Sequence, residues 1–314
     1  MRDTIDNASE LTRTSPFPTR QHGRGLAWGH FGEILQGSFR DNNGAICRAL
    51  VTIRCDRFGA MAIFELDGTS EVTVIPAQFR KAQRAAENTL AYLGLTRGGG
   101  RLTVISGTPA GIGAGSSTSD VVAAIRAVDD AFGAGLVEME FARLAVDTEV
   151  AVDPIMLCSR PEVLFAHRHG TVLEHFAGAL PLLRVIGITD GPPVDTVALT
   201  PAPYSRVQID EFESLRARLR LAIASRDVRG LAAVATRSAQ INQSHLPKPS
   251  LPMLLEIVRH SGAAGLSVSH SGSAVGILFD GQLSENDQGV LQAHNLLAEA
   301  GFARRWTFCT GDAS

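Results

Sequence analysis

Residues 107–120, GTPAGIGAGSSTSD, place four glycines ahead of a run of hydroxyl side chains. A glycine-rich loop that leads into a helix exposes backbone N–H groups and the positive end of the helix dipole, with no Cβ atoms to keep a ligand away. Such loops bind anions, most often phosphate. The hydroxyl groups that follow can donate to phosphate oxygens or bind a Mg2+ ion that accompanies a nucleotide. The stretch therefore predicts a phosphate-binding loop, in which a side chain at Gly113 would occupy the space of the phosphates.

The same residues also fit a purely structural pattern. Ser117 and Asp120 have the S-x-x-D spacing of a capping box ahead of an apolar helix. Two common nucleotide loops do not fit. No lysine follows the glycines as a Walker A motif requires, and Ser116 or Thr118 stands where the third glycine of a dinucleotide fingerprint belongs. The loop is thus either a helix cap or a phosphate site of another kind.

The elements around the loop follow from hydrophobic spacing. Apolar residues repeat with helical spacing from Val121, so a helix is expected from near Ser117 to about Phe132, after a strand at residues 102–106. Other strands are expected at residues 49–54, 60–65, 72–76, 182–189, 265–269, 274–279 and 304–309. Other helices are expected around residues 82–93, 138–150, 212–223, 228–235 and 254–258. Strands and helices mix without strict alternation, which favours an α+β class.

Composition limits the function. The 314 residues are 45% hydrophobic and carry 29 basic against 32 acidic side chains, so two domains are expected and binding of nucleic acid or an anionic membrane is not. No apolar stretch is long enough for a membrane span, and the N-terminus lacks the apolar core of a signal peptide. Cys47, Cys55, Cys158 and Cys309 show no metal-like spacing and have apolar neighbours. We therefore expect buried, reduced thiols and a cytoplasmic protein with small-molecule partners.

The glycine loop resembles a known signature. Residues 109–119, PAGIGAGSSTS, are similar to the P-x-x-x-G-L-G-S-S-A-A motif of the GHMP kinases, and residues 269–279, SHSGSAVGILF, resemble the C-terminal glycine-containing motif of that family. The resemblance implies a two-domain α+β fold with ATP and Mg2+ bound between the domains. Residues 25–180 would form the N-terminal ATP-binding domain with a left-handed crossover, and residues 181–314 a ferredoxin-like domain. Residues 1–24, polar and without periodicity, are expected to be a mobile tail.

Shorter segments resemble one branch of the family. GEILQG at residues 32–37 is similar to the GE-[LI]-[LV]-QG segment of the L-threonine kinases of cobalamin metabolism. DGPPVDT at residues 190–196 resembles their D-x-G-G-x-V-D-T turn, and LPKP at residues 246–249 resembles a segment that they share. These matches span residues 25–280. They imply phosphorylation of L-threonine to O-phospho-L-threonine.

The resemblance assigns a set of candidate residues. The nucleotide would be bound by Pro109, Gly111, Gly113, Gly115, Ser116, Ser117 and Thr118. The metal would be bound by Ser117 and Glu149, with Asp153 and Ser117 as the catalytic residues. The substrate would be bound by Glu33, Gln36, Asp195, Thr196, His270, Ser271 and Gly272. The oligomeric state is not predicted.

Structural explanations remain open for several of these residues. The family segment E-P-T-D is replaced by Glu149-Val-Ala-Val-Asp153, so the carboxylate of Asp153 either orients the acceptor hydroxyl or caps the turn before Pro154. Glu33, between two glycines, is either a substrate-binding acid or a solvated turn residue. Asp195 and Thr196 equally suit a turn, and His270 a structural role. His167 and His169 have the i, i+2 spacing of a strand, where zinc binding would lack a third ligand.

Three functions are compatible with the sequence. The first is ATP-dependent phosphorylation of the L-threonine side chain. The second keeps the kinase chemistry but acts on another small hydroxy amino acid or alcohol. The third is a non-catalytic, nucleotide-binding regulator on the same fold, which the altered segment before Asp153 would suit.

Overall fold

The structure is a computed structural model that describes residues 20–95, 97–157, 162–192 and 203–311. Its strands are β1 (His22–Arg40), β2 (Ile46–Leu66), β3 (Val72–Ile75), β4 (Gly100–Ser106), β5 (Val163–Ala166), β6 (Thr171–His175), β7 (Leu183–Thr189), β8 (Gly265–Val268), β9 (Ala274–Asp280) and β10 (Trp306–Cys309). Its helices are α1 (Arg80–Tyr92), α2 (Ser116–Phe132), α3 (Glu138–Thr148), the short 3-10 helix η1 (Pro154–Met156), α4 (Arg206–Ser225), α5 (Val228–Asn242), α6 (Leu251–Ser261) and α7 (Gln288–Glu299).

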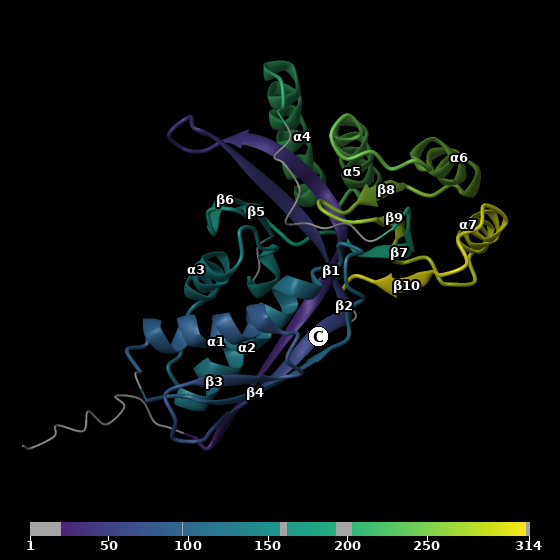
Figure 1. The fold of residues 1–314 in the computed structure, drawn as a ribbon. Coiled ribbons are helices and arrows are strands. Elements are labelled where there is room, and N and C mark those ends of the chain that lie inside the picture. Colours follow the sequence, from purple (N-terminus) through teal and green to yellow (C-terminus); the bar gives the residue numbers. More distant parts are fainter. Residues whose placement is uncertain (1–19, 96, 158–161, 193–202, 312–314) are drawn as a thin grey trace, which may run out of the picture.

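The long antiparallel pair β1 and β2 crosses the whole molecule (Figure 1). Within the described residues the strand order is β10-β7-β9-β8-β1-β2-β4-β3, with β5 paired to β2 and β6 paired to β5. Asp41 closes the hairpin between β1 and β2 by accepting hydrogen bonds from the N–H groups of Asn43 and Ala45, both at 2.8 Å. Because β1 also pairs with β8 at Glu33, one strand links the two halves of the chain.

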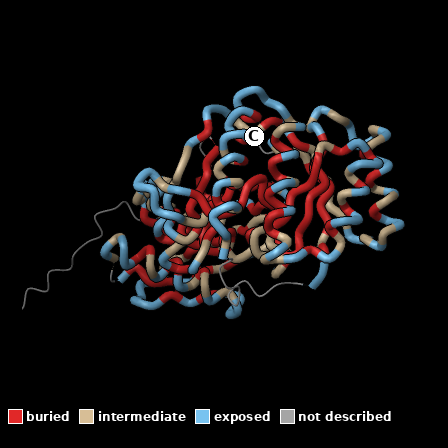
Figure 2. The backbone as a smooth tube through the Cα atoms, turned by 90° about the horizontal axis from the view of Figure 1, so that it is seen from above, coloured by how far each residue is buried: buried red, intermediate tan, exposed pale blue. Residues whose placement is uncertain are grey.

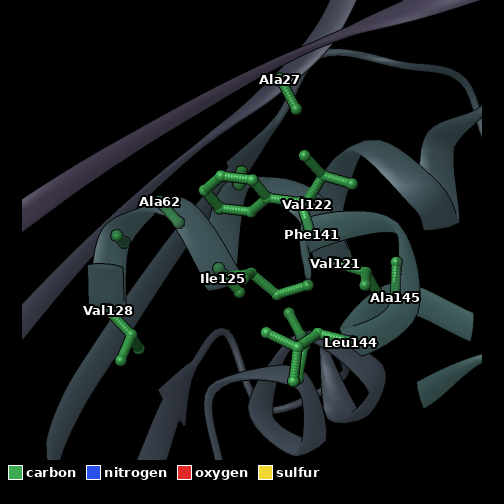
Figure 3. Close-up of a cluster of buried hydrophobic side chains, with 14 of the residues drawn as sticks. Ala27, Ala62, Val121, Val122, Ile125, Val128, Phe141, Leu144 and Ala145 are labelled. Carbon is green, nitrogen blue, oxygen red and sulfur yellow. The ribbon is translucent and has the colours of Figure 1, made fainter. Parts of the chain in front are cut away.

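The N-terminal half packs around α2. Eleven of its 17 residues are buried, and its apolar side chains meet those of β1, β2 and α3 in one cluster (Figure 3). The glycines of β1 let the helix lie almost against the strand. A Cβ on Gly25 would come within 2.0 Å of the carbonyl oxygen of Ala123, and one on Gly23 within 2.2 Å of that of Ala127. The start of α2 is thereby fixed over the middle of the sheet.

The C-terminal half has the strand order β10-β7-β9-β8, with antiparallel pairing throughout. The chain order is strand, helices, two strands, helix and strand, so the strands follow the 4-1-3-2 arrangement of a ferredoxin-like sheet. Helices α4 to α7 lie around this half (Figure 1). The predicted α+β class with a ferredoxin-like C-terminal domain is confirmed, whereas the boundary between residues 180 and 181 stays a prediction.

Several local expectations differ from the structure. Residues 49–54 and 60–65 are strands as expected, but both are parts of the single strand β2, and α7 was not predicted. Strand β1 begins at His22, inside the segment expected to be a tail. The strand was missed because its glycines interrupt the apolar pattern of a strand. His167 and His169 lie in the turn between β5 and β6 and not on a strand.

Burial follows the layers of the fold. The interior strands and α2 are buried, whereas the outer helices expose one side (Figure 2). In the described ranges no helix is both long and apolar enough to cross a membrane. Cys55 is buried as expected, but Cys47 and Cys309 are only half-buried. These three do not form disulfides with one another, and Cys158 lies outside the described residues.

Candidate functional site

The glycine loop ends in an uncapped helix. Gly111, Gly113 and Gly115 have φ angles of +74°, +78° and +72°, which glycine adopts without strain. Gly115 is the N-cap residue of α2, and no side chain caps this end of the helix. The capping-box explanation is therefore wrong, and the first N–H groups of α2 have no side-chain acceptor. Such an end can bind an anion.

A second glycine segment packs directly on this loop. The N–H of Ala274 donates to the carbonyl of Ile112 at 2.8 Å. A Cβ on Gly272 would lie 2.3 Å from the backbone nitrogen of Gly113, and one on Gly113 would lie 2.8 Å from Ser269 and Gly272. Gly113 is thus needed for contact with the chain itself, and the expectation that it also leaves room for phosphate stays a prediction.

Lys248 holds this second segment in place. Its buried ammonium group donates a hydrogen bond to the carbonyl of Gly272. Burial lowers the pKa of Lys248 to about 8. The LPKP segment therefore contributes to the site through one lysine.

Three polar side chains meet on the first turn of α2. The Ser117 hydroxyl donates to Oε1 of Glu149 and accepts from Nζ of Lys81 at 3.0 Å. Nζ of Lys81 also lies 2.7 Å from Oε1 of Glu149. The Glu149 side chain is 5% exposed and that of Lys81 is 44% exposed. Carboxylate, hydroxyl and ammonium groups thus lie together where an anion-binding helix end begins.

Asp153 lies beside this group. Its Oδ2 is 3.4 Å from the Thr118 hydroxyl, which is also 3.3 Å from Oε2 of Glu149. Its side chain makes no capping hydrogen bond to η1, so the explanation that it only caps the turn before Pro154 is wrong. Oδ2 instead lies 3.0 Å from Nε2 of His30.

Glu33 is a strand residue and not a solvated turn. It pairs with Thr52 of β2 on one side and Val268 of β8 on the other, and its side chain is fully buried. Its Oε1 lies 3.5 Å from Nδ1 of His30. The carboxylate therefore lies on the buried side of His30, and one of its oxygens is within 4.8 Å of a carboxylate oxygen of Asp153.

Gln36 and His270 form the neighbouring polar contact. Nε2 of Gln36 donates to the Val268 carbonyl at 3.1 Å, and its Oε1 is 3.3 Å from Nδ1 of His270. The rings of His270 and His167 are 4.6 Å apart. Burial lowers the pKa of His270 to about 4 and that of His167 well below its usual value, so both rings are neutral near pH 7.

The charges of His30, Glu33 and Asp153 depend on one another. Burial alone would lower the pKa of His30, but the carboxylates of Asp153 and Glu33 raise it to about 9. Burial and the negative charge of Asp153 raise the pKa of Glu33 to about 7. Burial would raise the pKa of Asp153, but the cationic His30 outweighs it and lowers that pKa to about 2. The ring is thus a cation beside an ionised Asp153.

The raised pKa of His30 predicts how stability changes with pH. The ring has a pKa of about 9 in the folded chain and 6.5 in the unfolded chain, so its stabilisation is present below pH 6.5 and is lost as the pH rises through 9. From pH 7 to 9.5 the free energy of unfolding of the wild type should fall relative to that of His30→Gln, by about 1–3 kcal/mol. Denaturant unfolding at several pH values measures this difference.

The comparison between the two proteins removes the titrations that do not depend on His30. The lowered pKa of Lys248 acts in the opposite direction above about pH 8, but it is common to both proteins. His294→Gln is the matched control, because His294 is a half-buried ring of α7, outside the candidate site. Its Nε2 is 3.2 Å from the hydroxyl of Thr307 on β10. If the difference in the free energy of unfolding between the wild type and His30→Gln stayed constant over this pH range, that would argue against a cationic His30.

The structure brings most of the predicted residues together. Gly111, Gly113, Gly115, Ser117, Thr118, Glu149, Asp153 and Gly272 lie at the loop or in contact with it. Pro109, Ser116 and Ser271 are half-buried residues of the same two segments, and their roles stay predictions. Asp195 and Thr196 lie outside the described residues.

Sequence reasoning missed three residues of this site. His30, Lys81 and Lys248 contact it from β1, α1 and the segment before α6. Lys81 and Lys248 are the only lysines of the chain, and this rarity could have marked them as candidate site residues. His30 had no such signal, because its partner Asp153 is 123 positions away in the sequence.

Comparison with known proteins gives two family matches. Residues 80–156 match the model described as "GHMP kinases N terminal domain", and residues 219–295 match "GHMP kinases C terminal". An L-threonine kinase of Salmonella typhimurium is 27% identical over 66% of this chain and 67% of its own length. An L-threonine kinase of Citrobacter freundii is 30% identical over 57% of this chain and 62% of its own length.

Solved structures share the fold. Homoserine kinase from Cytophaga hutchinsonii superposes with a TM-score of 0.69 at 16% identity, covering 93% of this chain and 95% of its own. A structure of MDDEF in complex with MVAPP, AMPPCP and magnesium has a TM-score of 0.61 at 16% identity, covering 92% and 97%. These likenesses show the fold.

Proposed function

Because the chain belongs to the GHMP kinases and carries both of their domains, we propose that it transfers the γ-phosphoryl group of ATP to the side-chain hydroxyl of L-threonine. The observation that carries this proposal is the contact between Asp153 and the uncapped first turn of α2 through the Thr118 hydroxyl. An acid for the acceptor and an anion site for the nucleotide are thereby neighbours. O-phospho-L-threonine and ADP would be the products.

The residues on α2 suit a nucleotide with its metal. The uncapped N-terminus would bind phosphate oxygens, and Ser117 and Glu149 offer the oxygen ligands that Mg2+ prefers. When bound, Mg2+ would neutralise negative charge on the phosphates. Lys81, half-exposed at the same point, adds a second positive charge that can turn to a phosphate.

Asp153 would hold the acceptor. The hydroxyl oxygen forms a bond to the γ-phosphorus as the bond to the β–γ bridging oxygen breaks, and ADP leaves with that electron pair. Asp153 accepts the hydrogen bond of the hydroxyl and so fixes its direction. Its lowered pKa makes it a weak base, so the proton leaves late, through Asp153 to solvent. Positioning is thus its larger contribution.

A screen of ADP release tests the acceptor. L-threonine, L-serine, L-homoserine and unrelated alcohols are compared with saturating ATP and Mg2+, and the product is identified by 31P NMR. We expect L-threonine to give the highest kcat/KM. A higher value with another alcohol would support the second function, and no ADP release with any of them would support the nucleotide-binding regulator.

Ser117→Ala should raise KM for MgATP about 10- to 100-fold, because a hydrogen bond between charged or metal-bound groups is lost. Its melting temperature should change little, since Gly115 and not Ser117 occupies the N-cap position. Steady-state kinetics at several Mg2+ concentrations measures this. Ser119→Ala is the control, because among the described residues that hydroxyl bonds only to the Ser116 carbonyl, at 2.9 Å. Unchanged MgATP use in Ser117→Ala would remove Ser117 from the site.

A further inference from the structure

Three ionisable side chains form a row from the core to the surface. The Glu33 side chain is 0% exposed, that of His30 is 3% exposed and that of Asp153 is 20% exposed. They come from two distant parts of the chain, since Glu33 and His30 belong to β1 and Asp153 precedes η1. Asp153 reaches the anion-binding end of α2 through Thr118. The His30 ring also lies against this end, since a Cβ on the N-cap residue Gly115 would be 2.6 Å from its Cδ2 atom.

The ring of His30 lies between the two carboxylates. Its Nε2 is 3.0 Å from Oδ2 of Asp153, and its Nδ1 is 3.5 Å from Oε1 of Glu33. A neutral imidazole carries one N–H, so one of the carboxylates would face a lone pair. The doubly protonated ring donates toward both. Neither Nδ1 nor the oxygens of Glu33 make a hydrogen bond of normal geometry, so the inner contact is a looser charge interaction.

The same three residues have ligand atoms within 4.8 Å of one another, as a metal site would. The two ring nitrogens point in different directions, however, and each faces a different carboxylate. One ion bound at Nε2 would leave Nδ1 facing Glu33, and the reverse holds for an ion at Nδ1. The arrangement suits a shared proton better than a metal.

We propose that His30, supported from the core by Glu33, is the positioning residue of Asp153. Its Nε2–H holds the Asp153 carboxylate in its charged form and turned toward the first turn of α2, and Glu33 keeps the ring oriented from behind. The proposal rests on the proposed function only in giving Asp153 the acceptor hydroxyl. It assigns Glu33 to the support of His30 and not to the ammonium or hydroxyl of the substrate, as the sequence suggested.

The surrounding charges favour this state. Asp153 is also faced by His270 and His167, which are neutral near pH 7 because burial lowers the pKa of each. Glu149 approaches Asp153 only through Thr118 and is neutralised by Lys81. His30 is thus the cation next to Asp153, and its deprotonation would leave that carboxylate unpaired. Activity should therefore fall as the pH rises through about 9.

Single-turnover phosphoryl transfer from pH 5 to 10, at saturating ATP and L-threonine, tests the proposal. For His30→Gln we expect a loss of about 10- to 100-fold at pH 7.5, with an unchanged ATP dissociation constant, because one charge-assisted hydrogen bond to Asp153 is lost. The fall in the transfer rate near pH 9, which is the basic limb of the pH–rate profile, should disappear. An acidic limb should move to higher pH, because Asp153 loses the cation that lowers its pKa.

Glu33→Gln separates positioning from mere packing. The amide keeps the shape, but it no longer stabilises the ring cation, so the basic limb should move to lower pH with a loss of only a few-fold at pH 6. His294→Gln is the control for both variants. The proposal would be overturned if the pH–rate profiles of both variants kept the limbs of the wild-type profile and only the melting temperatures changed.

An NMR titration keeps the outcome independent of turnover. The His30 ring should be protonated at pH 8 in the full chain and should lose its proton at a lower pH in Asp153→Asn. If no acceptor is phosphorylated but this titration is found, the proposed function fails and the positioning of Asp153 stands. A neutral His30 at pH 8 in the wild type would overturn the positioning role, whatever the kinase activity.

Discussion

Asp153→Asn should lower kcat roughly 10²–10⁴-fold, with little change in the nucleotide dissociation constant. The amide keeps the size of the side chain and can still accept a hydrogen bond from Nε2 of His30, 3.0 Å away. It cannot take the proton of the acceptor hydroxyl, and it lacks the negative charge that aligns this hydroxyl for attack. The phosphate loop is untouched, so ATP binding should persist.

Single-turnover transfer and the melting temperature are measured on the same Asp153→Asn preparation. A catalytic Asp153 predicts slow transfer in a folded protein that still binds ATP. A structural Asp153 predicts a kcat within a few-fold of the wild type and a lower melting temperature. Near-normal turnover would shift the catalytic assignment to Glu149.

Glu149 is the weaker candidate for that role on the present geometry. Its Oε1 is already engaged by Lys81 at 2.7 Å and by the Ser117 hydroxyl. A carboxylate neutralised in this way suits the metal and phosphate side of the site. Asp153 instead faces the neutral rings of His167 and His270, on a side of the site where an uncharged acceptor hydroxyl would not compete with the phosphates.

The sequence predicted a helix or strand well where the apolar residues of one face mark its full length. Helix α2 was expected from near Ser117 to Phe132 and runs from Ser116 to Phe132, because its apolar residues have to cover the sheet. Strand β1 was missed because its inward positions include glycines at 23 and 25, which are there for the close approach of α2. A glycine selected for packing gives no strand signal.

The candidate site was predictable on one side only. The glycine loop is a local motif, so Ser117 and Thr118 could be found from neighbouring residues. Glu33 was expected to face the substrate because glycines flank it, yet pairing with Thr52 and Val268 on both sides buries it. Contacts such as His30 to Asp153 join strands and loops that only the tertiary fold brings together. No spacing rule within one segment can find them.

Gly272→Ala should disrupt the site more than its size suggests. The added Cβ would lie 2.3 Å from the nitrogen of Gly113 and from the carbonyl oxygen of Ile112, and 2.4 Å from the Cα of Gly113. All three are backbone atoms, so no side chain can move aside. The two glycine segments would have to separate, which breaks the hydrogen bond from Ala274 to Ile112. Overpacking of this kind costs about 1–3 kcal/mol of stability.

The nucleotide should be affected as strongly as the fold. Moving Gly113 away from Gly272 changes the path of the loop that ends at Gly115, so the first N–H groups of α2 no longer converge on one anion. We expect ATP affinity to fall by at least about tenfold, measured by calorimetry, with a lower melting temperature. Gly107→Ala is the matched control in the same loop, because a Cβ added there would come no closer to another described residue than 3.5 Å, from the Gly59 oxygen, and the φ of Gly107 is not positive. Equal ATP affinity in Gly272→Ala and Gly107→Ala would mean that the packing of the two segments does not shape the phosphate site.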